Sequence, residues 1–247
     1  MLCGAFGEDA RGRWYLNLQV EILEDDRHGS GEIGIDLGLT SLVTMSAGGK
    51  LEAPRLYRKH ERALAIAQRA GQKRRARTIH ARIANCRRHF LHDLSTRLVR
   101  ENRRICVGNV NSSGLARTRL AKSVLDAGGS LLRSQLRYKA TRHGAEYIEV
   151  DERFSTQVCS ACAARGGPQG REGLVVREWV CGGCGARHDR DINSAINLLV
   201  SGRNVGLQQT EIPSVQEGED VKAALSHVCA GQGRLAMMAR HGEQPRR

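Results

Sequence analysis

Alternation of apolar and polar residues predicts short strands in several parts of the chain. Trp14 to Leu23 alternates with a period of two, and Glu32 to Met45 has the pattern of a strand, a tight glycine turn and a second strand. Two shorter apolar segments, at 104–107 and 145–150, are also typical of buried strands. The acidic and glycine-rich residues 24–31 predict a turn or a short linker.

Apolar residues spaced three and four apart predict the helices. Residues 54–104 have this pattern, with a break predicted at 71–72. A second amphipathic helix is predicted at 121–143, interrupted at 128–129, and a third begins at Asp191. The buried stripe of the first helical region is predicted to contain Ile79, Ile83, Cys86, Phe90, Leu94 and Leu98. Helices that alternate with short apolar strands favour an α/β fold, a sheet with crossover helices.

The periodicity fades after Val200. Residues 201–247 mix glycine, glutamine, arginine and scattered charges. We expect a mostly flexible tail there, with a short helix at 221–228.

Four of the eight cysteines form two Cys-x-x-Cys pairs, Cys159 with Cys162 and Cys181 with Cys184. Four thiolates complete a tetrahedral zinc site, and a closed ligand set of this kind holds structure and does no chemistry. Unrelated thiol pairs or redox motifs are the alternative. The equal spacing within the pairs and the length of the loop between them favour structural zinc.

Two aspartates stand at positions where a carboxylate needs a partner. Asp36 interrupts an otherwise apolar strand, and Asp191 begins an apolar-periodic helix. Asp36 could cap its turn by accepting a hydrogen bond from Gly38, and Asp191 could cap its helix. Because a second candidate aspartate begins a helix downstream, a metal site is favoured over a turn cap at Asp36.

Basic residues dominate the charge of the chain. Lys and Arg number 39 against 26 Asp and Glu, for a formal charge of +13, which indicates a polyanionic partner such as nucleic acid. Acidic residues are nearly absent between Arg62 and Arg88, whereas solvated helix faces usually mix signs. We therefore predict a surface that follows a phosphate backbone. Its predicted members are Lys73, Arg74, Arg75, Arg77, Arg82, Arg87 and Arg88.

Membrane association is not expected. No apolar run approaches the length of a transmembrane span, and the basic helices lack aromatic-rich apolar faces. The first residues show neither the basic start nor the apolar core of a signal peptide. We therefore expect a reducing compartment, where cysteines bind metal more often than they form disulfides.

The motifs together resemble the transposon-encoded TnpB proteins, the OrfB-type products of insertion sequences that are related to type V CRISPR effectors. The resemblance extends from Trp14 to Val200. The motifs that carry it are Gly34-Ile-Asp36-Leu-Gly-Leu39, Leu120 to Gly128, Val150 to Cys162, Val176 to Cys181 and His188 to Asn193.

This resemblance implies an RNase H-like (RuvC) nuclease domain with an inserted zinc ribbon. It further implies an RNA-guided DNA endonuclease that uses two Mg²⁺ ions, with DNA and a guide RNA as partners, in the bacterial or archaeal cytoplasm at the nucleoid. The layout it implies is a remnant of an amino-terminal recognition region at 1–31, the nuclease domain at 32–157, the zinc ribbon at 158–187, a last nuclease helix at 188–200 and the tail at 201–247.

The family's first and last catalytic acids correspond to Asp36 and Asp191. Most relatives carry the middle acid, a Glu, straight after the strand that matches 105–107, where this chain has Gly108. One branch of the family has Gly there and a Glu on the adjacent strand, and Glu152 fits that place. The resemblance thus implies that these three carboxylates hold magnesium.

Two neighbouring acids offer alternatives to this assignment. Asp151 competes with Glu152, and since consecutive strand residues face opposite ways, at most one of the two should reach the site. Asp189 competes with Asp191, but it precedes the predicted helix, so we expect it to cap that helix or to contact a ligand. Glu152 could also be a surface residue ahead of the first cysteine pair.

Two other functions are compatible with parts of the sequence. A nucleic-acid-binding protein without cleavage, either repressor-like or a remnant, predicts that Glu152 faces away from Asp36 and Asp191. A zinc-ribbon binding module explains the cysteines but leaves Asp36 without a partner. The nuclease accounts for the cysteines and the carboxylates together.

Overall fold

The computed structural model describes residues 3–9, 11–20, 28–109, 126–173 and 175–209. The predicted helix at 221–228 and the start of the one predicted at 121–143 lie outside these residues. The chain divides into two units, the first formed by residues 1–23, 62–82 and 213–247 and the second by residues 24–61 and 83–212.

The first unit contains an antiparallel hairpin of β1 (Cys3–Glu8) and β2 (Trp14–Gln19), in which Phe6 pairs with Leu16. Strand β2 confirms the strand predicted from Trp14 onward, and β1 was not predicted. The Asp9 carboxylate closes the turn by accepting hydrogen bonds from the backbone N–H groups of Arg11, at 2.8 Å, and Arg13, at 3.1 Å.

The basic helical region forms two helices, α1 (Leu56–Arg69) and α2 (Lys73–Glu101), which confirms the predicted break. Gly71 separates them with a φ of 65°, a left-handed conformation that glycine adopts without steric cost. The predicted stripe is wrong for Cys86, which is exposed, because the helix buries Leu91 instead. The buried face therefore turns slightly from the predicted one as it follows the sheet.

The second unit is built on a five-stranded sheet in the order β5-β4-β3-β6-β7. Strands β3, β6 and β7 are parallel to one another, and β4 and β5 are antiparallel additions next to β3. The bounds of the strands are β3 (Gly31–Asp36), β4 (Ser41–Met45), β5 (Lys50–Glu52), β6 (Asn102–Gly108) and β7 (Glu146–Val150). The helix α5 (Gly129–Arg142) connects β6 to β7, as a parallel connection requires.

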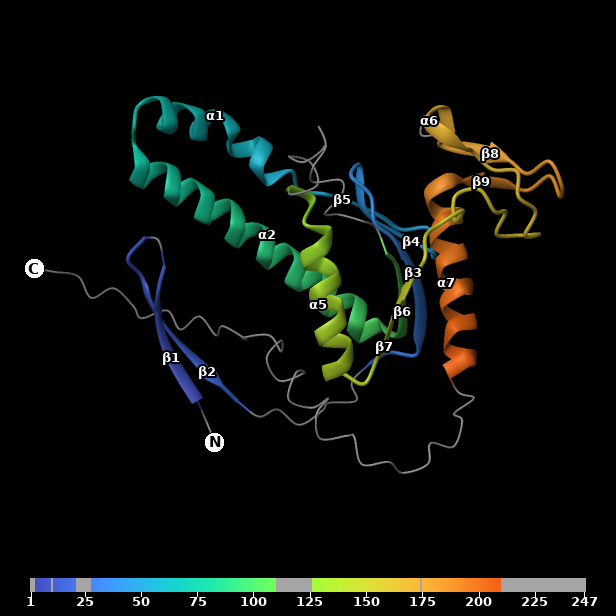
Figure 1. The fold of residues 1–247 in the computed structure, drawn as a ribbon, viewed down its shortest axis with the longest axis horizontal. Coiled ribbons are helices and arrows are strands. Elements are labelled where there is room, and N and C mark those ends of the chain that lie inside the picture. Colours follow the sequence, from blue (N-terminus) through green and yellow to red (C-terminus); the bar gives the residue numbers. More distant parts are fainter. Residues whose placement is uncertain (1–2, 10, 21–27, 110–125, 174, 210–247) are drawn as a thin grey trace, which may run out of the picture. The chain divides into compact units, whose positions relative to one another are not determined.

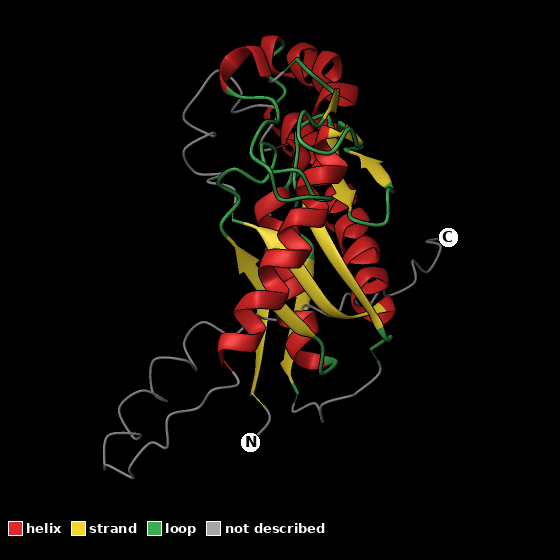
Figure 2. Cartoon of the chain, turned by 90° about the vertical axis from the view of Figure 1, so that its right-hand side faces the viewer, coloured by secondary structure: helices red, strands yellow, loops and turns green. Residues whose placement is uncertain are grey.

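The two faces of this sheet pack against different helices (Figures 1 and 2). Ile35 and Ile105 are fully buried on the face covered by α2 and α5. Cys106 and Val150 point to the other face and pack against α7 (Arg190–Gln209). This division follows from the alternation of side chains along each strand. It confirms the predicted α/β class.

Helix α7 lies very close to the sheet. A Cβ at Gly34 of β3 would overlap the carbonyl oxygen of Ala195 and lie 2.9 Å from the Cβ of Leu199, so only glycine fits there. The predicted end of this helix near Val200 is wrong, because α7 continues to Gln209. Gly202 does not break the helix. It lies directly over the Cys106 side chain, where a larger residue would not fit.

A small ribbon lies between β7 and α7 in the sequence. It contains α6 (Gly170–Gly173), β8 (Glu178–Val180) and β9 (Arg187–Asp189), and the two strands pair in an antiparallel ladder. Among the described residues, no helix is long and apolar enough to cross a membrane.

Candidate functional site

Asp36 is the last residue of β3 and lies on the α7 face, since it is two residues beyond Gly34. It is partly buried. The turn after it does not use the aspartate as a cap: the Gly38 N–H donates to the carbonyl oxygen of Leu42, at 3.4 Å. The carboxylate of Asp36 is therefore available to the site.

Asp191 reaches the same edge of the sheet from α7. Ala195 lies against Gly34, and Asp191 precedes Ala195 by one helical turn, about 6 Å, while Asp36 follows Gly34 by about 6.6 Å along the strand. These two displacements bring the aspartates to a common level. Asp189 is the cap of this helix, since its Oδ1 accepts from the N–H groups of Asp191, at 3.1 Å, and Ile192, at 3.0 Å.

Glu152 completes the group by occupying space that Gly108 leaves empty. A Cβ at Gly108 would point at this carboxylate, 3.2 Å from its Oε2, and would lie 3.3 Å from Cδ1 of Leu198. Gly108 belongs to the strand beside β3, about 4.8 Å away. Glu152 itself lies two residues beyond Val150, so strand alternation directs it toward the α7 face.

The neighbouring Asp151 does not share this position. It is exposed, it accepts from the backbone N–H of Arg153 at 3.0 Å, and it pairs with the Arg153 guanidinium at 3.7 Å. Glu152 is partly buried, and its N–H donates to Oδ1 of Asn109 at 3.3 Å. Of these two acids, the structure brings Glu152 and not Asp151 to Gly108.

The electrostatics of Asp36 indicate that the three carboxyl groups interact. Burial, together with the negative charges of Asp191 and Glu152, raises the pKa of Asp36 to about 7, against the opposing effects of Arg190 and a hydrogen bond with Ser194. Burial also raises the pKa of Glu152. A carboxyl group in such a position favours a proton or a cation at its oxygens.

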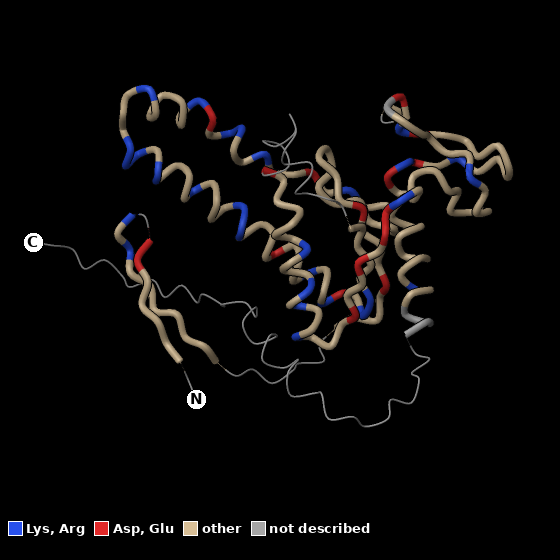
Figure 3. The backbone as a smooth tube through the Cα atoms, viewed as in Figure 1, with Lys and Arg blue, Asp and Glu red and all other residues tan. Residues whose placement is uncertain are grey.

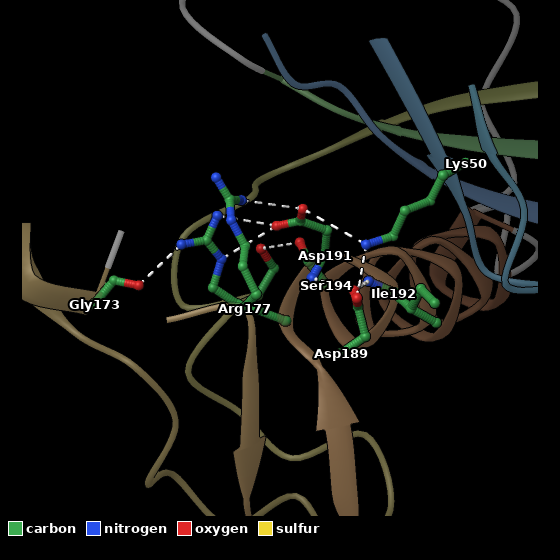
Figure 4. Close-up of polar contacts among 9 residues, drawn as sticks. Lys50, Gly173, Arg177, Asp189, Asp191, Ile192 and Ser194 are labelled. Carbon is green, nitrogen blue, oxygen red and sulfur yellow. Dashed lines mark hydrogen bonds and ion pairs between the residues drawn. The ribbon is translucent and has the colours of Figure 1, made fainter. Parts of the chain in front are cut away.

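Basic side chains that the sequence analysis missed surround Asp191 (Figure 4). Arg190 donates to Oδ1 through Nε, at 3.1 Å, and Nη2, at 3.0 Å, and Arg177 donates to Oδ2 at 3.4 Å. Lys50 approaches from the side opposite Arg177, with Nζ 2.7 Å from Oδ2 of Asp189 and 4.0 Å from Oδ2 of Asp191. Nothing in their spacing links these three cations, because they come from β5, the ribbon and α7.

The carboxylates and the thiols differ in how tightly they converge. Within the part of the chain that the structure describes, the four predicted cysteines are the one group of potential ligands whose donor atoms all lie within 4.8 Å of one another. The three carboxylates form a more open group than this. Hard oxygen donors around an open space suit ions that retain water molecules and bind a substrate oxygen.

The four cysteines form a compact cluster that could hold one metal ion. Sγ of Cys159 lies 3.7 Å from that of Cys184, and Sγ of Cys162 lies 3.7 Å from that of Cys181. The backbone N–H groups of Cys184 and Gly183 lower the pKa of Cys181 to about 6, which favours the thiolate that a metal requires.

His188 is a further contact of this cluster that the sequence analysis did not predict. Its Nε2 lies 3.0 Å from Sγ of Cys159, and its ring packs against that of Trp179 at an interplanar angle of 35°, with centroids 4.8 Å apart. Because His188 directly precedes the cap of α7, it joins the cysteine cluster to the helix that carries Asp191.

The predicted basic surface follows the first half of α2, where Lys and Arg recur with few acidic residues between them (Figure 3). Six of its seven predicted members are exposed: Lys73, Arg74, Arg75, Arg77, Arg82 and Arg88. The prediction is wrong for Arg87, which is half-buried and pairs with the buried Asp126 at 2.8 Å. That partner is 39 residues away in the sequence, so helix periodicity could not reveal it.

Two protein-family models match adjoining parts of the chain. The model described as a probable transposase of the OrfB_IS605 type matches residues 17–119, and the one described as the Cas12f1-like TNB domain matches residues 130–198. The chain belongs to the OrfB, TnpB-like family. This membership confirms the resemblance that the motifs carry.

Several curated proteins are similar to this member of the family. A Streptomyces pristinaespiralis protein named "Putative RNA-guided DNA endonuclease" is 39% identical over 209 residues, covering 78% of this chain and 51% of the relative. Escherichia coli InsQ, which has the same description, is 28% identical over 225 residues, covering 78% of this chain and 55% of InsQ. The chain thus spans about half the length of the curated relatives it matches.

The fold is similar to that of a longer protein chain in a solved complex. The protein in the cryo-EM structure of the Cas12f1-sgRNA-target DNA complex matches with a TM-score of 0.50 and 14% sequence identity, over 77% of this chain and 54% of that one. At this identity the likeness concerns the fold alone.

Proposed function

We propose that this protein is an RNA-guided DNA endonuclease of transposon origin that hydrolyses phosphodiesters at a metal site formed by Asp36, Glu152 and Asp191. The observation that carries the proposal is the place of Glu152, whose carboxylate fills the space in front of Gly108 and raises the pKa of Asp36. The relatives' descriptions as RNA-guided DNA endonucleases support the reaction and the two nucleic-acid partners.

The fold we propose is RNase H-like. The five-stranded sheet supports this assignment, since its three parallel strands end at one edge and two antiparallel strands extend it on the β3 side. The first acid ends the central strand β3, and the last acid begins the helix that packs on it. Ligands of α/β sheets commonly bind at this edge, beyond the carboxyl ends of the strands.

Magnesium is the metal that this donor set suits best. When two such ions are bound, they activate the attacking water and stabilise the leaving oxygen. The protein's own contribution is to hold three carboxylates in place before the reaction. Asp36 lies on a strand, Asp191 on a capped helix and Glu152 against a glycine, so that none has to be ordered during the reaction.

The cations beside Asp191 have a role in the same proposal. Lys50 and Arg177 offset the charge of the aspartates in the absence of metal. Both side chains are long and partly exposed, so they can turn to the phosphate of the scissile nucleotide once the carboxylates are otherwise engaged.

For the cysteine cluster we propose structural zinc. A tetrahedral ion with Zn–S bonds of about 2.3 Å separates its sulfurs by about 3.8 Å. The two sulfur pairs at 3.7 Å fit this requirement. The exposed basic side chains of α2 are proposed to contact the phosphate backbone of the guide or the DNA, leaving sequence recognition to base pairing.

A nucleic-acid-binding protein without cleavage is the second candidate function. The observation in its favour is that Asp191 already has basic partners on both of its oxygens. A site stabilised in this way could remain without metal.

Cleavage of guide-matched and single-stranded DNA, with and without Mg²⁺, distinguishes the two functions. We expect Mg²⁺-dependent cleavage by the wild type and its loss in Asp191→Asn. The matched control is Asp151→Asn, which removes an exposed acid one residue from Glu152 and should leave cleavage unchanged. Binding of DNA or RNA by the wild type without cleavage at any Mg²⁺ concentration would support the second function.

A further inference from the structure

We propose that three polar side chains of α7, Asn193, Ser194 and Asn197, are positioning residues that set the distance of Glu152 from Asp36 and Asp191. The inference rests on the proposed function, because it concerns how the same metal site is held. We refer to these three side chains as the α7 strap.

Glu152 needs such support because of where it lies in the chain. Strand β7 ends at Val150, so the ladder of backbone hydrogen bonds ends before the glutamate. Residues 153–157 form turns on the way to the cysteine cluster. Asn109 provides one contact from the sheet side, at 3.3 Å. Without another restraint, the backbone of this segment could move relative to α7.

The two asparagines hold the segment after Glu152 through its carbonyl groups. Nδ2 of Asn197 donates to the carbonyl oxygens of Ser155, at 2.8 Å, and Val158, at 2.7 Å. Nδ2 of Asn193 donates to the same two oxygens, at 3.3 and 2.8 Å. Since the asparagines are four residues apart, they lie on one face of the helix. The two asparagines therefore restrain the segment at both Ser155 and Val158.

Asn193 also fixes the start of the cysteine cluster. Its Oδ1 accepts from the backbone N–H of Ser160, at 2.9 Å, immediately after the ligand Cys159. The side chain is 1% exposed, so each of its polar groups would be costly to leave unpaired. The strap thus connects the cysteine cluster, the Glu152 segment and the catalytic helix.

Ser194 connects the strap directly to the carboxylates. Its hydroxyl is 2.8 Å from that of Ser155, and it is also hydrogen-bonded to the Asp36 carboxyl. The backbone N–H of Ser155 donates to the carbonyl oxygen of Glu152 at 3.1 Å. A continuous set of hydrogen bonds therefore joins Asp36 to the backbone of Glu152 through α7. Hydrogen bonds behind a metal ligand orient that ligand and raise its affinity for the metal.

The test is Mn²⁺ binding, measured by calorimetry on the zinc-loaded full chain. Asn197→Ala removes two of the strap's hydrogen bonds, and we expect it to weaken Mn²⁺ binding by about tenfold, the size typical of lost contacts behind a metal ligand. The zinc content should stay at that of the wild type. Asn204→Ala is the matched control, since Asn204 is exposed on the same helix and should leave Mn²⁺ binding unchanged.

A second measurement separates positioning from general stabilisation. In a Glu152→Gln background, Asn197→Ala should change Mn²⁺ binding by less than about twofold, because the strap acts through that glutamate. An equal loss in both backgrounds, or wild-type affinity in Asn197→Ala, would overturn the inference. Should Asn197→Ala fail to fold, Ser155→Ala removes only the link to Ser194 and is held to the same comparison. A wild type that binds no Mn²⁺ would instead overturn the proposed function.

Discussion

Replacing Asp36 with Asn should make the protein more stable at neutral pH in the absence of Mg²⁺. The folded pKa of Asp36 is about 7, against 3.8 for an ordinary Asp, so the folded state holds a proton more tightly than the unfolded state. Stability from this group is present at low pH and is lost as the pH rises through 7. Asn has the same shape, carries no charge and can still accept the hydrogen bond from Ser194.

The magnitude follows from the same pKa. Between pH 5.5 and 8.0 the wild type should lose about 2 kcal/mol through Asp36, since one pKa unit corresponds to about 1.4 kcal/mol and the group ionises in the folded state only near 7. The Asn variant should lose nothing through this position. All other groups are common to the two proteins.

Urea unfolding of both proteins at the two pH values, without added Mg²⁺, measures this difference. We expect the stability of Asp36→Asn relative to wild type to rise by about 2 kcal/mol from pH 5.5 to 8.0. Addition of Mg²⁺ at pH 8.0 should stabilise only the wild type. A relative stability that does not change with pH would show that neither burial nor neighbouring carboxylates raise the pKa of Asp36, and the site as described would be refuted.

Two further substitutions test the fold around the site. Gly34→Ala should destabilise the protein by about 3 kcal/mol or more, because the new Cβ overlaps the Ala195 carbonyl and α7 must move away; unchanged urea unfolding would mean that α7 does not pack there. Asp189→Ala should cost about 1 kcal/mol by removing the cap of α7, whereas Asp189→Asn keeps the acceptor and should cost less; equal losses would mean that the Lys50 ion pair, and not the cap, is the important contact.

Much of the fold could be predicted from the sequence because local patterns of apolar residues and glycines determine these elements. Alternation located β3, β4, β6 and β7, and Gly71 separated the two basic helices as predicted. The end of α7 could not be predicted in this way. The apolar periodicity fades after Val200, whereas the Cys106 side chain that lies against Gly202 comes from a strand far away in the sequence.

The candidate site was predictable only in part, for the same reason. The positions of Asp36 and Asp191 follow from local pattern, and Glu152 followed from the resemblance. The cations Lys50, Arg177 and Arg190 lie in separate segments, and only the folded chain brings them to Asp191 and its neighbour. Arg87 shows the opposite case. It was predicted to lie on the basic surface, but it forms an ion pair with the distant Asp126 and is half-buried.

The most direct test is to move the glutamate from position 152 to position 108, where most relatives carry it. Glu152→Ala should lower Mg²⁺-dependent DNA cleavage by about 100-fold or more, a loss of nearly 3 kcal/mol in transition-state stabilisation. Adding Gly108→Glu to that variant places a carboxylate in the same space, since a Cβ at 108 points at the Glu152 oxygens. We predict that the double variant recovers at least about tenfold of the lost rate. Full activity in Glu152→Ala, or a double variant as inactive as the single one, would contradict the claim that Glu152 replaces an acid at position 108.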